Sequence, residues 1–406
     1  MHIGIAGPIA TCDVLPLLDP GATVLPRGCE GAPLLATIIA ALLRRGHRVS
    51  AFTLSDDLPL RSDVRVVARG PAFELHLVPS RPRAWPLNGR RLGRIVDLYA
   101  FERAGLRAAI ESARPDVVHA HWAYEFAWAT LRSGLPHLVT CHDSPLVVAR
   151  FERDMRHGAY RWLRAGMAWH VLRHAARVTT VSPYMVEQVQ GLCRVPVQVV
   201  ANPISEQLER VPAQGPPSRP RVVMVCNGWG PRKNGDAGLR AFALLRRRLP
   251  VVELHLYGSG TEEGGPAWQS WRREGSPGQA VFHGAVTHDA VLSAMAEASL
   301  MLHPALEESF GAVLAEAMSV GLPVVAGRTS GAVAWVVGDA GELVDVTRPE
   351  AMADAMRALL LDPAAARLRA ALGRERVRTC FSPGAVAVQY EREYEAALAG
   401  ATRRVA

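Results

Sequence analysis

Two glutamates and a short glycine-containing turn lie between two apolar, strand-like runs in the second half of the sequence. Glu308 precedes a predicted helix, and Glu316 lies eight residues further on, which is roughly 12 Å along a helix axis. The amides of Phe310, Gly311 and Ala312 lack intrahelical partners at the helix start, so this turn favours an anion such as a diphosphate. The alternative is an ordinary capped helix, in which Glu308 favours the helix dipole and Glu316 is solvated.

A cationic signal follows the apolar run of residues 221–225. A glycine-containing loop leads there to Arg232 and Lys233, and Lys233 is the only lysine in the 406 residues. In a chain whose positive charge is otherwise carried by arginine, this exception favours a position that needs a compact ammonium group. The alternative is a solvated pair of charges that opens a helix.

Histidines follow two predicted strands of the first half. His119 and His121 belong to the segment 116–122, and His142 belongs to the segment 140–143. Ligands of open α/β sheets bind outside the carboxyl ends of the strands, so we expect these side chains beside a ligand. The alternative for each histidine is a structural ring that is satisfied in the core.

Both halves of the chain alternate strand-like runs with helical stretches, which predicts two α/β domains with parallel sheets. A proline-rich stretch at residues 203–220 separates the halves and cannot continue a helix or a sheet. The predicted strands are residues 3–6, 49–53, 116–119, 137–140, 178–181, 221–225, 251–257, 280–282, 300–302 and 323–326, and the predicted helices are residues 32–45, 98–112, 237–248, 290–298 and 311–319.

The segment that contains Glu308, Ser309, Phe310, Gly311 and Glu316, followed by Gly-Leu-Pro-Val-Val-Ala at 321–326, resembles glycosyltransferase family 4. The resemblance implies the GT-B fold, an α/β architecture of two doubly wound, Rossmann-like domains that face a central cleft. It implies an acceptor-binding domain at residues 1–202, a linker at 203–220, a nucleotide-sugar-binding domain at 221–382, and a C-terminal helix at 383–406 that returns to the first domain.

The resemblance also assigns donor-binding roles. Glu308 would contact hydroxyls of the donor sugar, Glu316 would hold the ribose diol, and Lys233 would neutralise the diphosphate. The family arginine is missing from residues 227–229, where Asn-Gly-Trp stands, and Arg232 is the expected substitute. The remaining donor-binding residues implied by the resemblance are Gly258, Val286, Ser309, Phe310, Gly311 and Ala312.

On the acceptor side, His142 matches the family histidine held close to the reacting centre, while His119 and His121 would help to shape the cleft. Gly28 and Gly31 match the glycines that family members carry after the first strand, although the loop of residues 8–30 is longer here. The extra length is expected either to form part of an acceptor pocket or to be an insert without that role. His142, Glu308 and Lys233 are the residues expected to be catalytic.

The implied reaction moves a sugar from a nucleoside-diphosphate sugar to a hydroxyl acceptor, with retention at the anomeric carbon and with neither a cofactor nor a metal. No Asp-x-Asp pair is present to hold phosphates through a metal. The alternatives are a sugar-nucleotide epimerase of the same fold and a non-catalytic protein that binds nucleotide sugars. A dehydrogenase is disfavoured because the first strand leads into Gly4-Ile-Ala-Gly7-Pro8 rather than G-x-G-x-x-G.

Composition narrows the setting. Hydrophobic residues make up 49% of the chain and the formal charge is +8, but no aromatic stacking sheet or recognition motif supports nucleic-acid binding. Six scattered cysteines without a C-x-x-C pair argue against zinc and disulfides. The sequence shows no export signal and no long apolar span, so a cytoplasmic protein is expected.

Arginines and tryptophans alternate at residues 150–177, including Trp162, Arg164, Trp169 and Arg173. This pattern leaves two interpretations open: a helix that lies on a membrane surface, and a covering helix with a solvated basic face.

Overall fold

A computed structural model describes residues 1–21, 25–151, 155–205, 219–275 and 279–405. The chain divides into two compact units. Unit 1 comprises Met1–Pro203 and Pro383–Ala406, and unit 2 comprises Ile204–Ser382. Most of the predicted linker at 203–220 lies outside the described residues.

The described residues of unit 1 form an eight-stranded sheet in the order β3-β4-β2-β1-β5-β6-β7-β8. Its neighbouring strands are parallel, except that β3 runs antiparallel to β4 at the edge. The strands are β1 (His2–Ala6), β2 (Arg48–Ser55), β3 (Val66–Gly70), β4 (Phe73–Pro79), β5 (Val117–His121), β6 (His137–Cys141), β7 (Val178–Thr180) and β8 (Val197–Val199).

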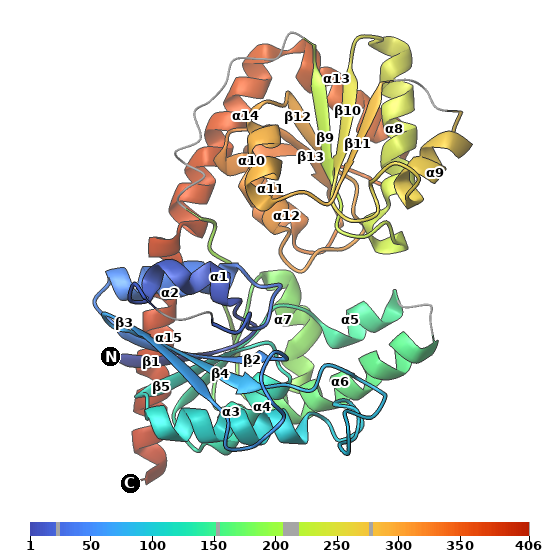
Figure 1. Ribbon diagram of the computed structural model, residues 1–406. Coiled ribbons are helices and arrows are strands. Elements are labelled where there is room, and N and C mark those ends of the chain that lie inside the picture. Colours follow the sequence, from blue (N-terminus) through green and yellow to red (C-terminus); the bar gives the residue numbers. More distant parts are fainter. Residues whose placement is uncertain (22–24, 152–154, 206–218, 276–278, 406) are drawn as a thin grey trace. The chain divides into compact units, whose positions relative to one another are not determined.

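Helices cover both faces of this sheet (Figure 1). The helix α2 packs beside α15 on one side, while α3, α4 and α6 pack together on the other. The helices are α1 (Thr11–Val14), α2 (Leu34–Arg44), α3 (Ala100–Ala113), α4 (Glu125–Arg132), α5 (Pro145–Arg150), α6 (Met155–His174), α7 (Pro183–Val189) and α15 (Pro383–Val405), with 3-10 turns at Leu15–Leu17 and Gln190–Leu192.

Unit 2 repeats this architecture on a smaller scale. Its described residues form a six-stranded parallel sheet in the order β11-β10-β9-β12-β13-β14, which is the strand order of a dinucleotide-binding fold. The strands are β9 (Arg221–Val225), β10 (Glu253–Tyr257), β11 (Ala280–Gly284), β12 (Leu300–His303), β13 (Val324–Gly327) and β14 (Gly341–Val344).

The helices of unit 2 also lie on both faces of the sheet (Figure 1). The helices α8 and α13 pack against each other, and α11 packs against α10, α12 and α14. The helices are α8 (Gly235–Arg248), α9 (Pro266–Arg273), α10 (His288–Ala296), α11 (Ala312–Ser319), α12 (Val333–Val337), α13 (Pro349–Leu361) and α14 (Pro363–Arg376), followed by a π-helical turn at Val377–Phe381, with 3-10 turns at Pro231–Lys233 and Gly338–Ala340.

The predicted fold class is confirmed: alternating strands and helices build two doubly wound sheets. The prediction of purely parallel pairing is wrong at one edge, where the hairpin of β3 and β4 places β3 antiparallel. The alternating pattern did not predict this pair, since a hairpin connection needs no intervening helix. Among the described residues, no helix has the length and apolar character needed to cross a bilayer.

The C-terminal helix α15 belongs to the core of unit 1. Its buried residues Val386, Tyr390 and Tyr394 join the apolar cluster formed by α2 and the sheet. The Tyr394 hydroxyl lies 2.8 Å from Nδ1 of His119 on β5. A polar contact therefore fixes the helix to the sheet from within the apolar cluster.

We predict that Tyr394→Phe destabilises the protein by about 1–3 kcal/mol, because the substitution leaves a fully buried imidazole nitrogen without a partner. Urea titration would measure the free energy of unfolding. Glu395→Gln, at an exposed position of the same helix, is the control and should stay within about 0.5 kcal/mol of the parent. Equal stability of Tyr394→Phe and the parent would contradict the prediction.

Candidate active site

The predicted donor-site residues lie at the carboxyl ends of two adjacent strands of unit 2. β9 leads to Arg232 and Lys233, and β12 leads to Glu308. These strands are neighbours at the point where the sheet order reverses, which is where open α/β sheets bind ligands. The two loops are braced together, because the Leu306 amide donates to the Arg232 carbonyl at 2.8 Å and the Asn234 amide group donates to the Pro304 carbonyl at 3.0 Å.

Lys233 and Glu308 form a nearly buried ion pair. The Lys233 Nζ lies 2.5 Å from Glu308 Oε1, and the Nε2 of buried His303 lies 3.4 Å from the same oxygen. Burial raises the pKa of the Glu308 carboxyl, but the hydrogen bond from His303 and the charge of Lys233 outweigh burial and hold this pKa well below its usual range. Glu308 is therefore an ionised acceptor of hydrogen bonds at neutral pH.

Arg232 is engaged by the other glutamate of the loop. Its Nη1 donates to the Glu307 carbonyl at 3.0 Å and lies 3.3 Å from the Glu307 carboxylate. It also lies 3.6 Å from Glu308. Burial raises the pKa of Glu307, although Arg232 opposes this effect. Glu307 was not predicted as a site residue, and its position next to Glu308 was the only signal for it.

Trp229 occupies the place where the family arginine was expected. Its indole Nε1 donates to the Asp236 carboxylate at 2.8 Å, and its ring lies so close to Gly235 that a Cβ there would come within 2.4 Å of it. The Trp229 side chain therefore packs on the start of α8. Arg232 is the neighbouring guanidinium that can reach the Glu308 loop.

The start of α11 has the geometry of an anion site. Gly311 precedes the helix with φ of +85°, a left-handed conformation that glycine adopts without strain. Phe310 is buried against the rings of Trp335 and Phe381, so its contribution to a ligand is its backbone. The first amides of α11, beginning at Ala312, have no partner within the helix.

Glu316 lies further along α11 and contacts α10. Its Oε1 is 3.0 Å from Nε2 of His288, and this hydrogen bond raises the pKa of His288. The Glu316 side chain is 19% exposed and therefore accessible to a ligand.

Two further predicted donor residues lie after β10 and β11. The Gly258 amide donates to the Gly284 carbonyl at 2.8 Å, and a Cβ at Gly258 would lie 2.3 Å from the Cys226 carbonyl oxygen. Glycine is required there by the close backbone approach. Val286 is 40% exposed in the loop after β11.

The three predicted histidines of unit 1 form one buried group. His119 has no exposed surface, and its ring nitrogens lie 2.8 Å from the Tyr394 hydroxyl and 2.7 Å from the Thr140 hydroxyl. His121, also fully buried, contacts His142 through Nδ1 and Nε2 at 2.9 Å. His119 and His121 therefore offer no surface to a ligand, whereas His142 is 9% exposed.

A cavity of about 510 Å³ lies beside these histidines within unit 1. Trp122, whose ring centroid is 4.2 Å from that of His142, and Asp143 both line it. Gly28 also lines the cavity, and a Cβ there would lie 2.4 Å from the Ile9 carbonyl oxygen. Gly31 is exposed, with open space around its Cα.

Two family models match the chain. The model described as Glycosyltransferase Family 4 matches residues 34–208, and the model described as Glycosyl transferases group 1 matches residues 219–362. Each half of the chain therefore matches a glycosyltransferase model, and the match of the N-terminal half is to family 4. This finding confirms both the family and the enzyme class predicted from the sequence.

Relatives and solved structures agree with this assignment. The glycosyltransferase is 28% identical to a glycogen synthase of Mycobacterium tuberculosis over 74% of this chain and 75% of the relative. It is 34% identical to a GDP-mannose-dependent phosphatidylinositol monomannoside mannosyltransferase of Mycolicibacterium smegmatis over 38% and 42% of the two chains.

The GT-B fold is shared with solved structures. The sucrose-phosphate synthase from Thermosynechococcus elongatus superimposes with a TM-score of 0.72 and 21% identity, over 98% of this chain and 99% of that one. The Anabaena HepE in complex with UDP and glucose superimposes with a TM-score of 0.64 and 18% identity, over 97% and 99% of the two chains.

The sequence reasoning missed several residues of the glycosyltransferase that surround the cavity of unit 1. Asp143 directly follows His142, and its carboxylate accepts from the Tyr124 hydroxyl at 3.0 Å. Burial raises the pKa of Asp143, although Tyr124 and Arg164 oppose this effect. Trp122 has φ of +63°, a strained conformation for a bulky residue. In the sequence, the position of Asp143 and Trp122 next to the histidine motifs was the available indication that they belong to the site.

We predict that the free energy of unfolding falls as the pH drops below about 6.5. Burial lowers the pKa of His119 and His121 well below their usual value and that of His142 to about 3. An unfolded histidine gains its proton near pH 6.5 while these folded ones stay neutral, so the unfolded state binds more protons. Each such histidine contributes a slope approaching about 1.4 kcal/mol per pH unit.

Urea titrations near pH 7 and pH 5 would measure this slope. His142→Gln should show a shallower decline than the parent protein. His174→Gln, at an exposed position on α6, is the control and should retain the parental decline. A parental slope in His142→Gln would show that His142 is not held neutral in the fold.

Proposed function

We propose that this glycosyltransferase moves a sugar from a nucleoside-diphosphate sugar to the hydroxyl of an acceptor, with retention at the anomeric carbon and without a metal. The observation that carries the proposal is the grouping of Lys233, ionised Glu308 and the start of α11 beside adjacent strands of unit 2. A cation, an acceptor of hydrogen bonds and backbone donors are the groups that a sugar diphosphate needs.

The donor roles follow from this geometry. Glu308 accepts hydrogen bonds from hydroxyls of the donor sugar, and Glu316, further along α11, accepts from the ribose diol. The loop of Ser309, Phe310, Gly311 and Ala312 directs backbone amides at the diphosphate. Gly258 and Val286 belong to the turns after β10 and β11, where the nucleoside is placed. The Anabaena protein of the same fold is solved in complex with UDP and glucose, which supports a nucleotide sugar as the donor.

Fixed positive charges take the role of a metal in this proposal. The anomeric carbon exchanges its bond to the diphosphate oxygen for one to the acceptor oxygen, and the acceptor's proton leaves with the nucleoside diphosphate. Negative charge grows on the diphosphate during this exchange. Lys233, Arg232 and the amides at the start of α11 stabilise that charge in place, so no reorganisation is needed.

Unit 1 supplies the acceptor side. We assign His142 the family role beside the reacting sugar, and its contacts with His121 and Trp122 hold its ring in place within unit 1. Because His119 and His121 are fully buried, their role is to position His142 rather than to touch the acceptor. Gly28 contributes to the cavity wall, and Gly31 lies in the same loop.

We predict that Glu308→Gln and Lys233→Ala each lower turnover by about 10²–10³-fold, because each removes a charge that acts directly on the donor. The purified protein would be incubated with a panel of nucleotide sugars and candidate acceptors in the presence of a chelator. Release of nucleoside diphosphate gives the rate, and NMR of the product gives the anomeric configuration. Glu263→Gln, at an exposed position of unit 2, is the matched control.

Each alternative gives a different result. Conversion of the donor into another nucleotide sugar without diphosphate release indicates an epimerase. Donor binding without turnover, with every candidate acceptor, indicates a binding protein. Loss of activity with chelator and its return with a divalent cation overturns metal independence, and an inverted product overturns retention.

A peripheral membrane contact is a further part of the proposal. On α6, the side chains of Met155, Trp162 and Trp169 are 90%, 63% and 50% exposed. Their seven-residue spacing places them along one side of the helix. Arg173 lies over the Trp169 ring at 5.7 Å. Exposed tryptophans with neighbouring arginines are typical of a helix that lies on an anionic lipid surface.

We expect the protein to co-sediment with vesicles of phosphatidylglycerol and phosphatidylcholine and much less with phosphatidylcholine alone, since both apolar burial and charge contribute. Trp162→Gln with Trp169→Gln should lower the bound fraction several-fold. Trp268→Gln, which alters a tryptophan on α9 of unit 2, is the control. Equal sedimentation of the double variant and the parent would rule out this helix as the contact.

A further inference from the structure

The cavity of unit 1 is lined by four arginines and four acidic side chains. Its arginines are Arg27, Arg94, Arg161 and Arg164, and its acids are Glu30, Asp56, Glu125 and Asp143. Half of the remaining lining residues are aromatic, namely Tyr99, Trp122, Tyr124, Phe126 and Tyr160. Such a lining suits a polar molecule that carries charge of its own.

Protein contacts account for only part of these charges. Arg164 pairs with Glu125 at 3.1 Å and lies over the Tyr124 ring at 3.7 Å. Arg27 pairs with Asp57 at 2.8 Å and lies 3.7 Å from Asp56. Within the described part of the chain, Arg94 and Arg161 have no acidic partner. Arg161 still acts on the Asp143 carboxylate, so Arg94 is the arginine of the wall without a described counter-charge.

The guanidinium of Arg94 has a buried nitrogen without a hydrogen-bond partner among the described residues. Its Nη1 donates to the Arg81 carbonyl at 2.7 Å. Its Nε is buried and has no hydrogen-bond partner, and no hydrogen bond from Nη2 to another described residue is found. The Arg94 side chain is half-buried, and a half-buried cation without a counter-charge is stabilised when an anionic partner arrives. An anion in the cavity would provide that partner.

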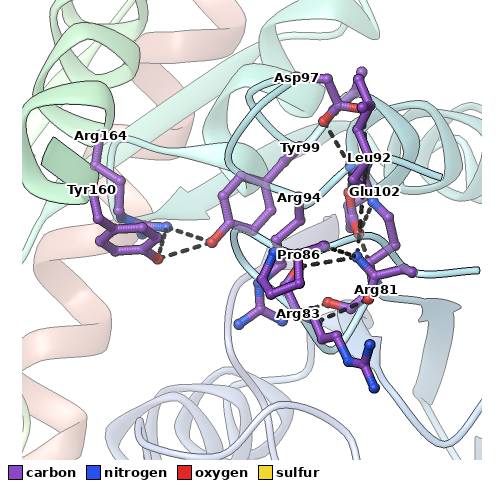
Figure 2. A network of polar contacts seen from close by, with 12 residues as sticks. Arg81, Arg83, Pro86, Leu92, Arg94, Asp97, Tyr99, Glu102, Tyr160 and Arg164 are labelled. Atoms are coloured by element: carbon purple, nitrogen blue, oxygen red, sulfur yellow. Dashed lines mark hydrogen bonds and ion pairs between the residues drawn. The ribbon is translucent and has the colours of Figure 1, made fainter. Parts of the chain in front are cut away.

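Arg94 lies on a loop whose conformation is fixed by the Arg81 side chain (Figure 2). The Arg81 guanidinium is 1% exposed and donates to Asp97 at 2.8 Å, to fully buried Glu102 at 2.6 Å, and to the Leu92 carbonyl at 3.0 Å. The Tyr99 amide closes the loop on the Arg94 carbonyl at 2.6 Å. This ionic clamp holds the loop that carries Arg94 in one conformation.

The same loop presents Tyr99 to the cavity. Leu98 and Tyr99 both have positive φ, of 53° and 62°, which is a strained conformation outside glycine. The Tyr99 hydroxyl lies 2.9 Å from that of Tyr160 and 3.4 Å from Arg164 (Figure 2). Strain that the surrounding contacts maintain is characteristic of sites where a side chain must point at a ligand.

Arg94 and Asp143 both line the cavity, one as a cation and one as an acid. Burial and Glu125 raise the pKa of the Cys29 thiol to about 11, and the charge of Arg94 opposes this effect. The arginines that act on Asp143 are Arg164 and Arg161. Asp143 adjoins His142 and is partly buried in the cavity wall, whereas Glu30 is exposed. Asp143 is therefore the acid that we expect to contact a ligand.

From this arrangement we infer that the cavity binds a hydroxyl acceptor that carries a phosphate or carboxylate group, with Arg94 as the residue that recognises the anion. In this arrangement the Asp143 carboxylate accepts a hydrogen bond from the acceptor hydroxyl, and Arg94 binds the anion. The inference rests on the proposed function, because it names the acceptor class of that reaction. A planar guanidinium matches both anions by two parallel hydrogen bonds.

The test compares anionic sugars with their neutral parents. Binding of glucose 6-phosphate, glucuronate and glucose to the full chain would be measured by titration calorimetry in the presence of saturating UDP, which occupies the donor site. We expect the two anionic sugars to bind at least about tenfold more tightly than glucose. Arg94→Gln should remove this preference. Arg90→Gln, an exposed arginine of the same loop, should keep it.

A second arm distinguishes a free anion from a lipid headgroup. Vesicles with and without phosphatidylinositol would be sedimented with the parent protein, Arg94→Gln and the Trp162→Gln, Trp169→Gln double variant. One outcome is vesicle binding that requires phosphatidylinositol and Arg94 but does not require the tryptophans. This result identifies a lipid-borne anion bound at Arg94. It supports the inference even when the free sugars bind weakly.

Equal binding of glucose and the anionic sugars, with no lipid arm dependent on Arg94, overturns the inference. A preference for anions that survives in Arg94→Gln overturns the role of Arg94. Failure of the proposed function is distinguishable, because it would appear as absent UDP binding or absent donor turnover, whereas the inference concerns unit 1 with the donor site filled.

Discussion

Parallel strand pairing is the constraint on which both units depend. A parallel strand must be followed by a crossover, so every loop that leaves a carboxyl end lies at the same edge of its sheet. Where the strand order reverses, successive crossovers turn to opposite faces and leave room for a ligand. Lys233 follows β9 and Glu308 follows β12 at that point in unit 2, while Trp122 and Asp143 follow adjacent strands β5 and β6 in unit 1.

Charge compensation determines how these loops are held. Glu308 is kept ionised by Lys233 and His303, and Arg81 is enclosed by Asp97 and Glu102. Buried ion pairs contribute little net stability, since desolvation offsets much of their attraction, but removal of one partner is costly. Their effect here is to fix geometry. Each loop contains one cluster of paired charges that sets its conformation. Each also carries further charged side chains that are available to a ligand.

Backbone strain lies in the same places. Tyr99 and Trp122 have positive φ beside the cavity of unit 1, and Asn234 has φ of +51° at the start of α8 beside Lys233. A non-glycine residue adopts this conformation only when surrounding contacts maintain it. At Asn234 the side chain donates to the carbonyls of Pro304 and Val346. Ligand-facing loops in both units therefore combine strain with strong tertiary hydrogen bonds.

The sequence by itself determined the features that have local periods. Apolar runs, glycine turns and the Glu308 to Glu316 segment indicated the fold class and the family, because strand alternation and helix starts are encoded within a few residues. Only the tertiary structure decided which polar groups are satisfied. His119 contacts a tyrosine 275 positions later, and Arg81, to whose carbonyl Arg94 donates, pairs with Glu102. Burial and partners at long range have no local signature, so these roles emerge only when distant segments pack together.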